Sequence, residues 1–200
     1  NPIALKGRET IENSSAIQTP DLWMQLAGMK KIQQALTQPN ILMRYAPENY
    51  QEMMASTFVA MHALGDEIQY QGEKMTALEH ALLNPESWVL KPQREGGGNN
   101  YFGPEMTQIL KSLNRAQQTS YILMQYIQPI HQPAWLVVDG RSEYAESVSE
   151  IGRYGILLAD QGQVIRNEDC GYLVRTKSAD VNEGGVCAGY SCLNTLILEE

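Results

Sequence analysis

Residues 90–100, with the sequence LKPQREGGGNN, combine two cations, one carboxylate and three consecutive glycines. An apolar run at residues 88–90 leads into them and predicts a short buried strand. Three adjacent glycines are costly to order, so we interpret them as backbone that bends sharply and approaches a ligand closely. Backbone N–H groups with Lys91 and Arg94 suit phosphate oxygens, and Glu95 suits a hard divalent cation such as Mg2+. The alternative interpretation is a flexible surface turn.

The elements that position this segment change from helical to β-type along the chain. Apolar residues recur at helical spacing across 22–36, which predicts one helix that begins with Thr19 as N-cap, buries its apolar stripe and ends at Pro39. Two further helices are predicted across 48–83, and another begins at Gly103. β-type runs follow at residues 121–124, 134–138, 154–158 and 172–174. Short connections favour antiparallel pairing, so the fold class is α+β, with helices early and a mostly antiparallel sheet late.

The composition narrows the class of protein. A formal net charge of −8 argues against nucleic acid or an anionic membrane as the main partner, and no apolar run is long enough for a membrane span. The three cysteines are too few and odd in number for a disulfide framework, which favours a reducing, cytoplasmic compartment. The three scattered histidines give little support for a zinc site. An anionic ligand must then be held by a local cluster of cations.

The chain resembles the carboxy-terminal portion of the eukaryotic-type glutathione synthetases, which are ATP-grasp ligases. Residues 91–100 resemble the glycine-rich loop of that family. Three further stretches match in the family's order, and they are residues 25–34, 120–124 and 173–186. The resemblance covers nearly the whole chain. It implies an ATP-grasp fold, with a helical segment at 1–85 that leads into the core and with the lid and nucleotide-binding sheet at 86–200.

The resemblance also assigns roles to individual residues. Arg175 resembles an arginine that grips the carboxylate of a peptide substrate, and we count it as catalytic and substrate-binding. Glu95 resembles a Mg2+ ligand. The residues implied to bind the nucleotide are Lys30, Lys91, Gly96, Gly97, Gly98, Asn99, Asn100, Phe102, Met124, Gln125, Tyr126, Ile127, Glu150, Lys177 and Glu183. The loop implied to close on the peptide comprises Gly184, Gly185, Val186 and Cys187.

Several positions depart from the family's pattern. Phe102 stands where a tyrosine is usual, and Gln125 with Tyr126 replaces a Glu-Lys pair on the strand that meets the adenine. Cys187 replaces a small residue. Because no His-Asp arrangement accompanies this cysteine, we interpret it as a substrate-facing position rather than a nucleophile. A lysine on a helix is usually solvated, and the resemblance alone favours a phosphate contact for Lys30.

The resemblance implies an ATP- and Mg2+-dependent ligase that joins glycine, or a close analogue, to gamma-glutamylcysteine through an acyl phosphate. It also implies a homodimer and an upstream half, outside these residues, that supplies further metal ligands and substrate contacts. A diverged glutathione-synthetase-like protein with altered substrate or weak activity, such as a secreted parasite effector, is one alternative. A non-catalytic nucleotide- or thiol-peptide-binding module is another.

Overall fold

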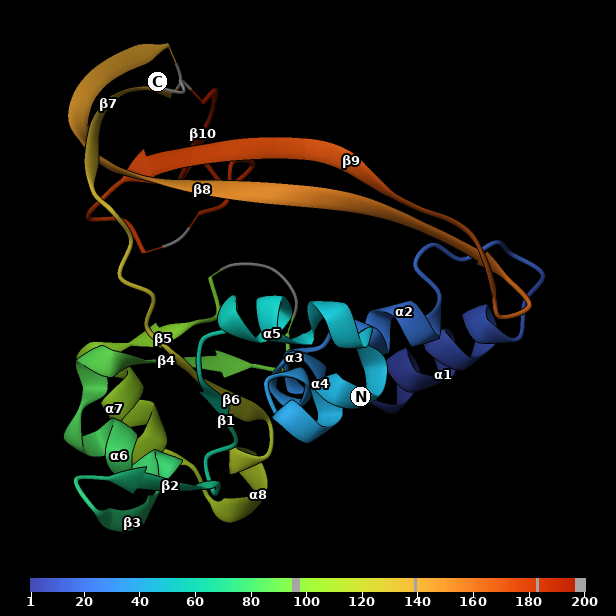
Figure 1. Cartoon of the computed structure of the whole chain (residues 1–200), viewed down its shortest axis with the longest axis horizontal. Coiled ribbons are helices and arrows are strands. Elements are labelled where there is room, and N and C mark those ends of the chain that lie inside the picture. Colours follow the sequence, from blue (N-terminus) through green and yellow to red (C-terminus); the bar gives the residue numbers. More distant parts are fainter. Residues whose placement is uncertain (95–97, 139, 183, 197–200) are drawn as a thin grey trace. The chain divides into compact units, whose positions relative to one another are not determined.

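The computed structural model describes residues 1–94, 98–138, 140–182 and 184–196 (Figure 1). The chain divides into two compact units, Asn1–Tyr126 and Ile127–Glu200. Unit 1 holds all helices of the described residues together with two small sheets, and unit 2 is built from antiparallel strands. This distribution confirms the predicted α+β class, with helices early and antiparallel strands late. No helix within the described ranges is long and apolar enough to cross a membrane.

Short helices open unit 1. They are α1 (Pro2–Glu12), α2 (Leu22–Ala27), α3 (Lys30–Leu36), α4 (Pro39–Tyr45) and α5 (Glu48–Ser56). The side chain of Asp21 accepts a hydrogen bond of 2.8 Å from the Met24 N–H group and so caps α2. The predicted cap at Thr19 is therefore wrong, because a carboxylate two residues later takes that role.

The single helix predicted across 22–36 is also wrong. Gly28 and Met29 separate α2 from α3, and Met29 adopts an extended backbone (φ −64°, ψ 145°) as the N-cap of α3. Pro39 does not end a helix but lies in the first turn of α4, where its missing N–H group is not needed. The apolar stripe expected to be buried stays partly exposed at Leu22, Leu26 and Ile32.

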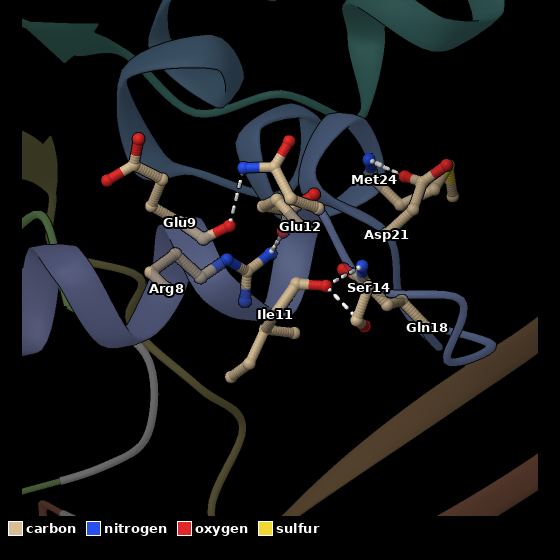
Figure 2. A network of polar contacts seen from close by, with 9 residues as sticks. Arg8, Glu9, Ile11, Glu12, Ser14, Gln18, Asp21 and Met24 are labelled. Carbon is tan, nitrogen blue, oxygen red and sulfur yellow. Dashed lines mark hydrogen bonds and ion pairs between the residues drawn. The ribbon is translucent and has the colours of Figure 1, made fainter.

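Side-chain hydrogen bonds fix the turn that joins α1 to α2 (Figure 2). The Ile11 carbonyl, in the last turn of α1, accepts hydrogen bonds from Ser14 Oγ at 2.7 Å and from Gln18 Nε2 at 3.1 Å. Arg8 and Glu12 form an ion pair of 2.5 Å one turn apart on the same helix. The two hydrogen bonds satisfy a carbonyl group that a helix end leaves without an intrahelical partner.

A four-stranded antiparallel sheet forms the centre of unit 1. Its strands, in spatial order, are β1 (Met61–His62), β6 (Tyr121–Gln125), β4 (Trp88–Pro92) and β5 (Tyr101–Phe102). The predicted buried strand at 88–90 is confirmed, since its side chains are 6% exposed or less. Helices α6 (Ala77–Leu83) and α7 (Gly103–Ser112) pack on this sheet (Figure 1). The buried core comprises Leu64, Ala77, Ala81, Trp88, Leu90, Met106, Leu110 and Leu123.

A hairpin of β2 (Glu67–Tyr70) and β3 (Glu73–Thr76) lies between α5 and α6. The prediction of two helices across 48–83 is therefore only partly right, because three strands separate them. Gln71 and Gly72 form the hairpin turn with positive φ angles of 53° and 86°, as a type I′ turn requires. The short helices η1 (Pro85–Ser87) and α8 (Arg115–Gln118) precede β4 and β6.

Unit 2 is organised by a long antiparallel ribbon of β8 (Arg141–Asp160) and β9 (Gln163–Ser178) (Figure 1). Strand β7 (Gln132–Val138) pairs with β8, and β10 (Cys192–Asn194) pairs with β9. Gln161 and Gly162 make the turn with φ angles of 46° and 79°. The β-type runs predicted after residue 130 are confirmed as parts of these longer strands. Near its turn the ribbon exposes the apolar side chains of Ile156, Leu157, Leu158, Val164 and Ile165.

Candidate functional site

The glycine-rich segment leaves the sheet of unit 1 and returns to it at nearly the same point. Leu90 on β4 pairs with Tyr101 on β5, so the strands on either side of the segment are neighbours in the sheet. Lys91 lies on β4 opposite Ile122 of β6. Gly98 adopts a positive φ of 78°, a conformation that favours glycine. Glu95, Gly96 and Gly97, which the sequence assigns to Mg2+ and phosphates, lie outside the described residues.

Helix α3 is tied to this loop at its amino-terminal end. The Lys30 ammonium donates a hydrogen bond of 2.5 Å to the Arg94 carbonyl, although 64 residues separate the two in sequence. The Lys31 N–H group donates to Gln93 Oε1 at 3.1 Å. Lys30 is partly buried, so it does not lie on an open solvated face. The structure thus brings Lys30 to the segment whose phosphate-binding role the sequence predicts.

A chain of hydrogen-bonded polar side chains, with Gln34 buried at its centre, supports this end of α3. Lys31 Nζ donates to Gln34 Oε1 at 2.5 Å, and Gln34 Nε2 donates to Asp66 Oδ2 at 3.1 Å. Asp66 Oδ2 also accepts the Ala63 N–H group at 2.8 Å. Gln34 is 2% exposed, so its amide is buried with both of its polar atoms bonded. Sequence reasoning missed Gln34, whose sole signal is its spacing of one helical turn from Lys31.

The strand predicted to meet the adenine is β6. Met124 pairs with Met61 and Val89 on its two sides and is half-buried. The N–H groups of Gln125 and Tyr126 donate to the carbonyls of Ala60 and Ser87 at 2.8 and 2.9 Å. These two N–H groups are therefore engaged within unit 1 and are not free to donate to a base.

Two of the departures from the family pattern meet in space. The rings of Phe102 and Tyr126 form an edge-to-face pair, with centroids 6.4 Å apart and planes at 87°. Phe102 and Tyr126 thus contact each other, and a change at one alters the surroundings of the other.

Asn99 and Asn100, which precede β5, are partly buried.

Unit 2 contains a pocket of about 290 Å3 that gathers several predicted site residues from four segments of the unit. Its lining includes Ile127, Glu150, Arg175, Lys177 and Gly184. Glu150 on β8 lies directly opposite Arg175 on β9, and their side chains form an ion pair. A Cβ atom at Gly184 would lie 3.7 Å from Glu150 Oε2. The pocket therefore offers the cations Arg175 and Lys177 to an anionic ligand, beside the carboxylate of Glu150.

The loop after Gly184 is compact. The Tyr190 N–H group donates to the Gly185 carbonyl and the Gly189 N–H group to the Val186 carbonyl, both at 3.0 Å. Within the described part of unit 2, the lining of the pocket includes neither Val186 nor Cys187, and Cys187 is exposed with a free thiol. Their predicted substrate contacts stay predictions. The predicted nucleotide ligand Glu183 lies outside the described residues.

The described residues hold no group of three or more His, Cys, Asp or Glu side chains that could bind a metal ion. The predicted Mg2+ ligand is Glu95, which falls in the undescribed stretch. The cationic residues that the structure does place, Lys30 and Arg175, are suited to the anionic ligands and not to the metal.

A solved structure and a family model are similar to this chain. The structure is similar to a glutathione synthetase-like effector from Globodera pallida, with a TM-score of 0.61 at 22% identity over 84% of this chain and 36% of that one. This likeness supports an ATP-grasp-like α+β fold. The family model for the eukaryotic glutathione synthase ATP binding domain matches residues 6–198. The chain belongs to this family.

The sequence of the chain is also similar to glutathione synthetases of known name. The chain is 38% identical over 195 residues to the glutathione synthetase large chain of Schizosaccharomyces pombe, covering 96% of this chain and 38% of that protein. It is 37% identical over 193 residues to the glutathione synthetase of Xenopus laevis, covering 94% and 40%. The chain thus spans about two fifths of the length of these relatives.

Proposed function

We propose that this chain is the ATP-binding part of an enzyme that joins glycine to gamma-glutamylcysteine and so forms glutathione. The observation that carries the proposal is the hydrogen bond from Lys30 to the Arg94 carbonyl, at the start of the glycine-rich loop. It joins a helix lysine to a loop of the type that covers phosphates, as an ATP site requires. The family membership of the chain supports the same conclusion.

The chemistry proposed is phosphoryl transfer followed by attack of an amine. The substrate carboxylate takes the gamma-phosphoryl group of ATP and releases ADP; the glycine amine then attacks the acyl phosphate, and inorganic phosphate leaves. Lys30 and Lys91 would hold phosphate oxygens, and Arg175 with its planar guanidinium would orient the peptide carboxylate. Mg2+, held in part by Glu95, would neutralise charge on the phosphates.

Other parts of the proposal concern the whole protein and the division of this chain into segments. An upstream half would supply the remaining metal ligands and substrate contacts, and the enzyme would be a cytoplasmic homodimer. Within the chain, residues 1–85 would lead into the ATP-grasp core, and residues 86–200 would form the lid and nucleotide-binding sheet. Glycine could be replaced by a close analogue as the acceptor.

The experiment that tests the function is an assay of ADP release by the complete natural protein. Release should require gamma-glutamylcysteine and glycine together, with glutathione formed in equal amount. Residues 1–200 alone should release no ADP in this way, because the resemblance assigns a second metal carboxylate to an upstream half that lies outside them. ADP release by the complete protein without either substrate, or none with both, would contradict the proposal.

A second candidate is a diverged relative with an altered substrate or weak activity. The aromatic contact between Phe102 and Tyr126 favours it, because both residues depart from the family pattern and they meet beside the strand assigned to adenine. In that case ATP binding would persist while ADP release with glycine stayed weak. Screening other small amino acids as acceptors in the same assay distinguishes the two candidates.

A further inference from the structure

Ser191 carries a buried hydroxyl that the fold of unit 2 does not explain. It lies directly before β10, and the residue is 5% exposed. Its Oγ atom has no hydrogen-bond partner among the residues that the structure describes. A buried hydroxyl without a partner lowers stability, so a native protein that keeps one usually has another use for it.

Other buried hydroxyls of unit 2 are satisfied. Ser147 is 1% exposed, and its Oγ donates to the Gln132 carbonyl at 2.6 Å. Thr176 is 0% exposed, and its Oγ1 lies 2.9 Å from Ser149 Oγ and accepts from Asn194 Nδ2 at 3.2 Å. Within the described part of the unit, burial by itself therefore does not leave a hydroxyl without a partner. Ser191 differs from these two in its location.

Ser191 belongs to the lining of the pocket that also contains Arg175, Lys177 and Glu150. A Cβ atom at Gly184 would lie 3.9 Å from Ser191 Oγ, so this hydroxyl stands next to the backbone that borders the pocket. The same Cβ atom would lie 3.7 Å from Glu150 Oε2, so the hydroxyl and this carboxylate both border Gly184.

We propose that Ser191 is a ligand-binding residue whose hydroxyl donates a hydrogen bond to an anionic oxygen of the molecule held by Arg175 and Lys177. The proposal rests on the function proposed above, under which this oxygen belongs to the carboxylate of gamma-glutamylcysteine or to a phosphate of ATP. A hydroxyl donor complements either oxygen. A ligand without an acceptor at this place leaves the hydroxyl unpaired, so Ser191 also selects among ligands.

The test compares two serine variants, Ser191→Ala and Ser147→Ala, in the complete natural protein. Calorimetric titration measures binding of gamma-glutamylcysteine and of ATP with Mg2+, and urea unfolding measures stability. Ser191→Ala should weaken binding of one ligand about tenfold, the usual effect of losing a hydrogen bond to a charged group. The weakened ligand identifies the source of the oxygen. The unfolding midpoint of Ser191→Ala should stay the same or rise, because the variant removes an unpaired buried hydroxyl.

Ser147→Ala should show the opposite pattern. It should lower the unfolding midpoint, because it leaves the Gln132 carbonyl without its donor, and it should not change either affinity, because Ser147 lies outside the pocket. Equal affinities of Ser191→Ala and the unmodified protein for both ligands would overturn the Ser191 proposal alone. So would a loss of stability in Ser191→Ala that matches Ser147→Ala, since the hydroxyl would then have an internal partner. If the unmodified protein binds neither ligand, the proposed function and the role of Ser191 fail together.

Discussion

Arg175 and Glu150 form an ion pair between directly opposed positions of strands β9 and β8. The resemblance assigns them to different ligands, Arg175 to the carboxylate of the peptide and Glu150 to the nucleoside. In the structure the Glu150 carboxylate already lies on the guanidinium that a substrate carboxylate is proposed to use. A bound peptide would therefore compete with Glu150 for Arg175 and release Glu150 toward the nucleotide.

We expect Glu150→Gln to change the two Michaelis constants in opposite directions. The variant removes the competing charge beside Arg175, so the Michaelis constant for gamma-glutamylcysteine should fall. It also weakens the proposed acceptor for ribose hydroxyls, so the Michaelis constant for ATP should rise. Steady-state kinetics of the complete natural protein, with each substrate varied in turn, measure both constants.

A matched control lies on the same ribbon. Arg153 and Asp169 also form an ion pair between β8 and β9, away from the pocket lining. Asp169→Asn should leave both constants unchanged, because both side chains of that pair are largely exposed and surface pairs contribute little. A parallel rise of both constants in Glu150→Gln would show that this residue supports the ribbon rather than the two ligands.

Neighbouring lysines on α3 should respond differently to substitution. Lys30 contacts the Arg94 carbonyl at the loop, whereas Lys31 Nζ bonds to the buried Gln34. We expect Lys30→Met to raise the Michaelis constant for ATP by about tenfold or more, since it removes a cation proposed to hold phosphate. Lys31→Met should instead lower the unfolding midpoint. ATP titrations and urea unfolding of both variants check this, and an unchanged ATP constant in Lys30→Met would exclude the phosphate role.

Gln34→Leu should destabilise unit 1 by about 1–3 kcal/mol. The leucine removes the donor to the Asp66 carboxylate and the acceptor of the Lys31 ammonium, so two charged groups lose a partner. Urea unfolding measures the change. Gln33→Leu is the matched control, because Gln33 is exposed and donates a side-chain hydrogen bond to the Gly28 carbonyl. Similar losses of unfolding free energy in the two variants would show that the buried hydrogen bonds of Gln34 do not stabilise unit 1.

The stability of unit 1 should fall when His62 is protonated. Burial, and more weakly the neighbouring His80, lower the pKa of His62 below its ordinary value of 6.5, while the charge of Asp66 opposes them. Because the folded-state pKa lies below the unfolded-state value, protons bind the unfolded chain more readily. The penalty is absent above pH 6.5, begins as the pH falls through this value and is complete below the folded-state pKa.

The measurement is urea unfolding at pH 7.5 and at pH 5.5 for the unmodified protein and for His62→Gln. The difference in unfolding free energy between the two pH values should be smaller in the variant, because glutamine does not titrate. The surroundings of the imidazole include Trp88, whose ring lies edge-on with centroids 5.7 Å apart, and His80, which accepts the Trp88 Nε1–H group at 2.9 Å. An identical pH dependence in both proteins would assign the effect to other groups.

The sequence predicted the strand at 88–90 and the strands after residue 119 well, because their signals are local, whereas it did not predict β1, β2 and β3. The apolar run at 88–90 and the runs after residue 119 mark strands without reference to anything else in the chain. The division of one predicted helix at Gly28 and Met29 was not visible, because apolar spacing continues through the break. The outcome there depends on how α3 docks onto the loop through Lys30 and Lys31, which is a tertiary contact.

The contacts between site residues could not be predicted from the sequence either. The ion pair of Glu150 and Arg175 depends on the register of two strands whose paired residues are 25 positions apart. A one-residue slip would place these side chains on opposite faces of the ribbon. Ser191 gave no signal, because a serine before a short strand is common and only its burial without a partner distinguishes it.

The pairing of Leu90 with Tyr101 has a consequence for how the family can change over time. The glycine-rich loop connects the neighbouring strands β4 and β5, whose register is set by their own pairing, so the length of the loop does not affect the register of the sheet. Insertions or deletions there change mainly the entropy of closing the loop, and each doubling of length costs only about 0.6 kcal/mol. The length of this loop can therefore change while the buried strands that flank it keep their pairing.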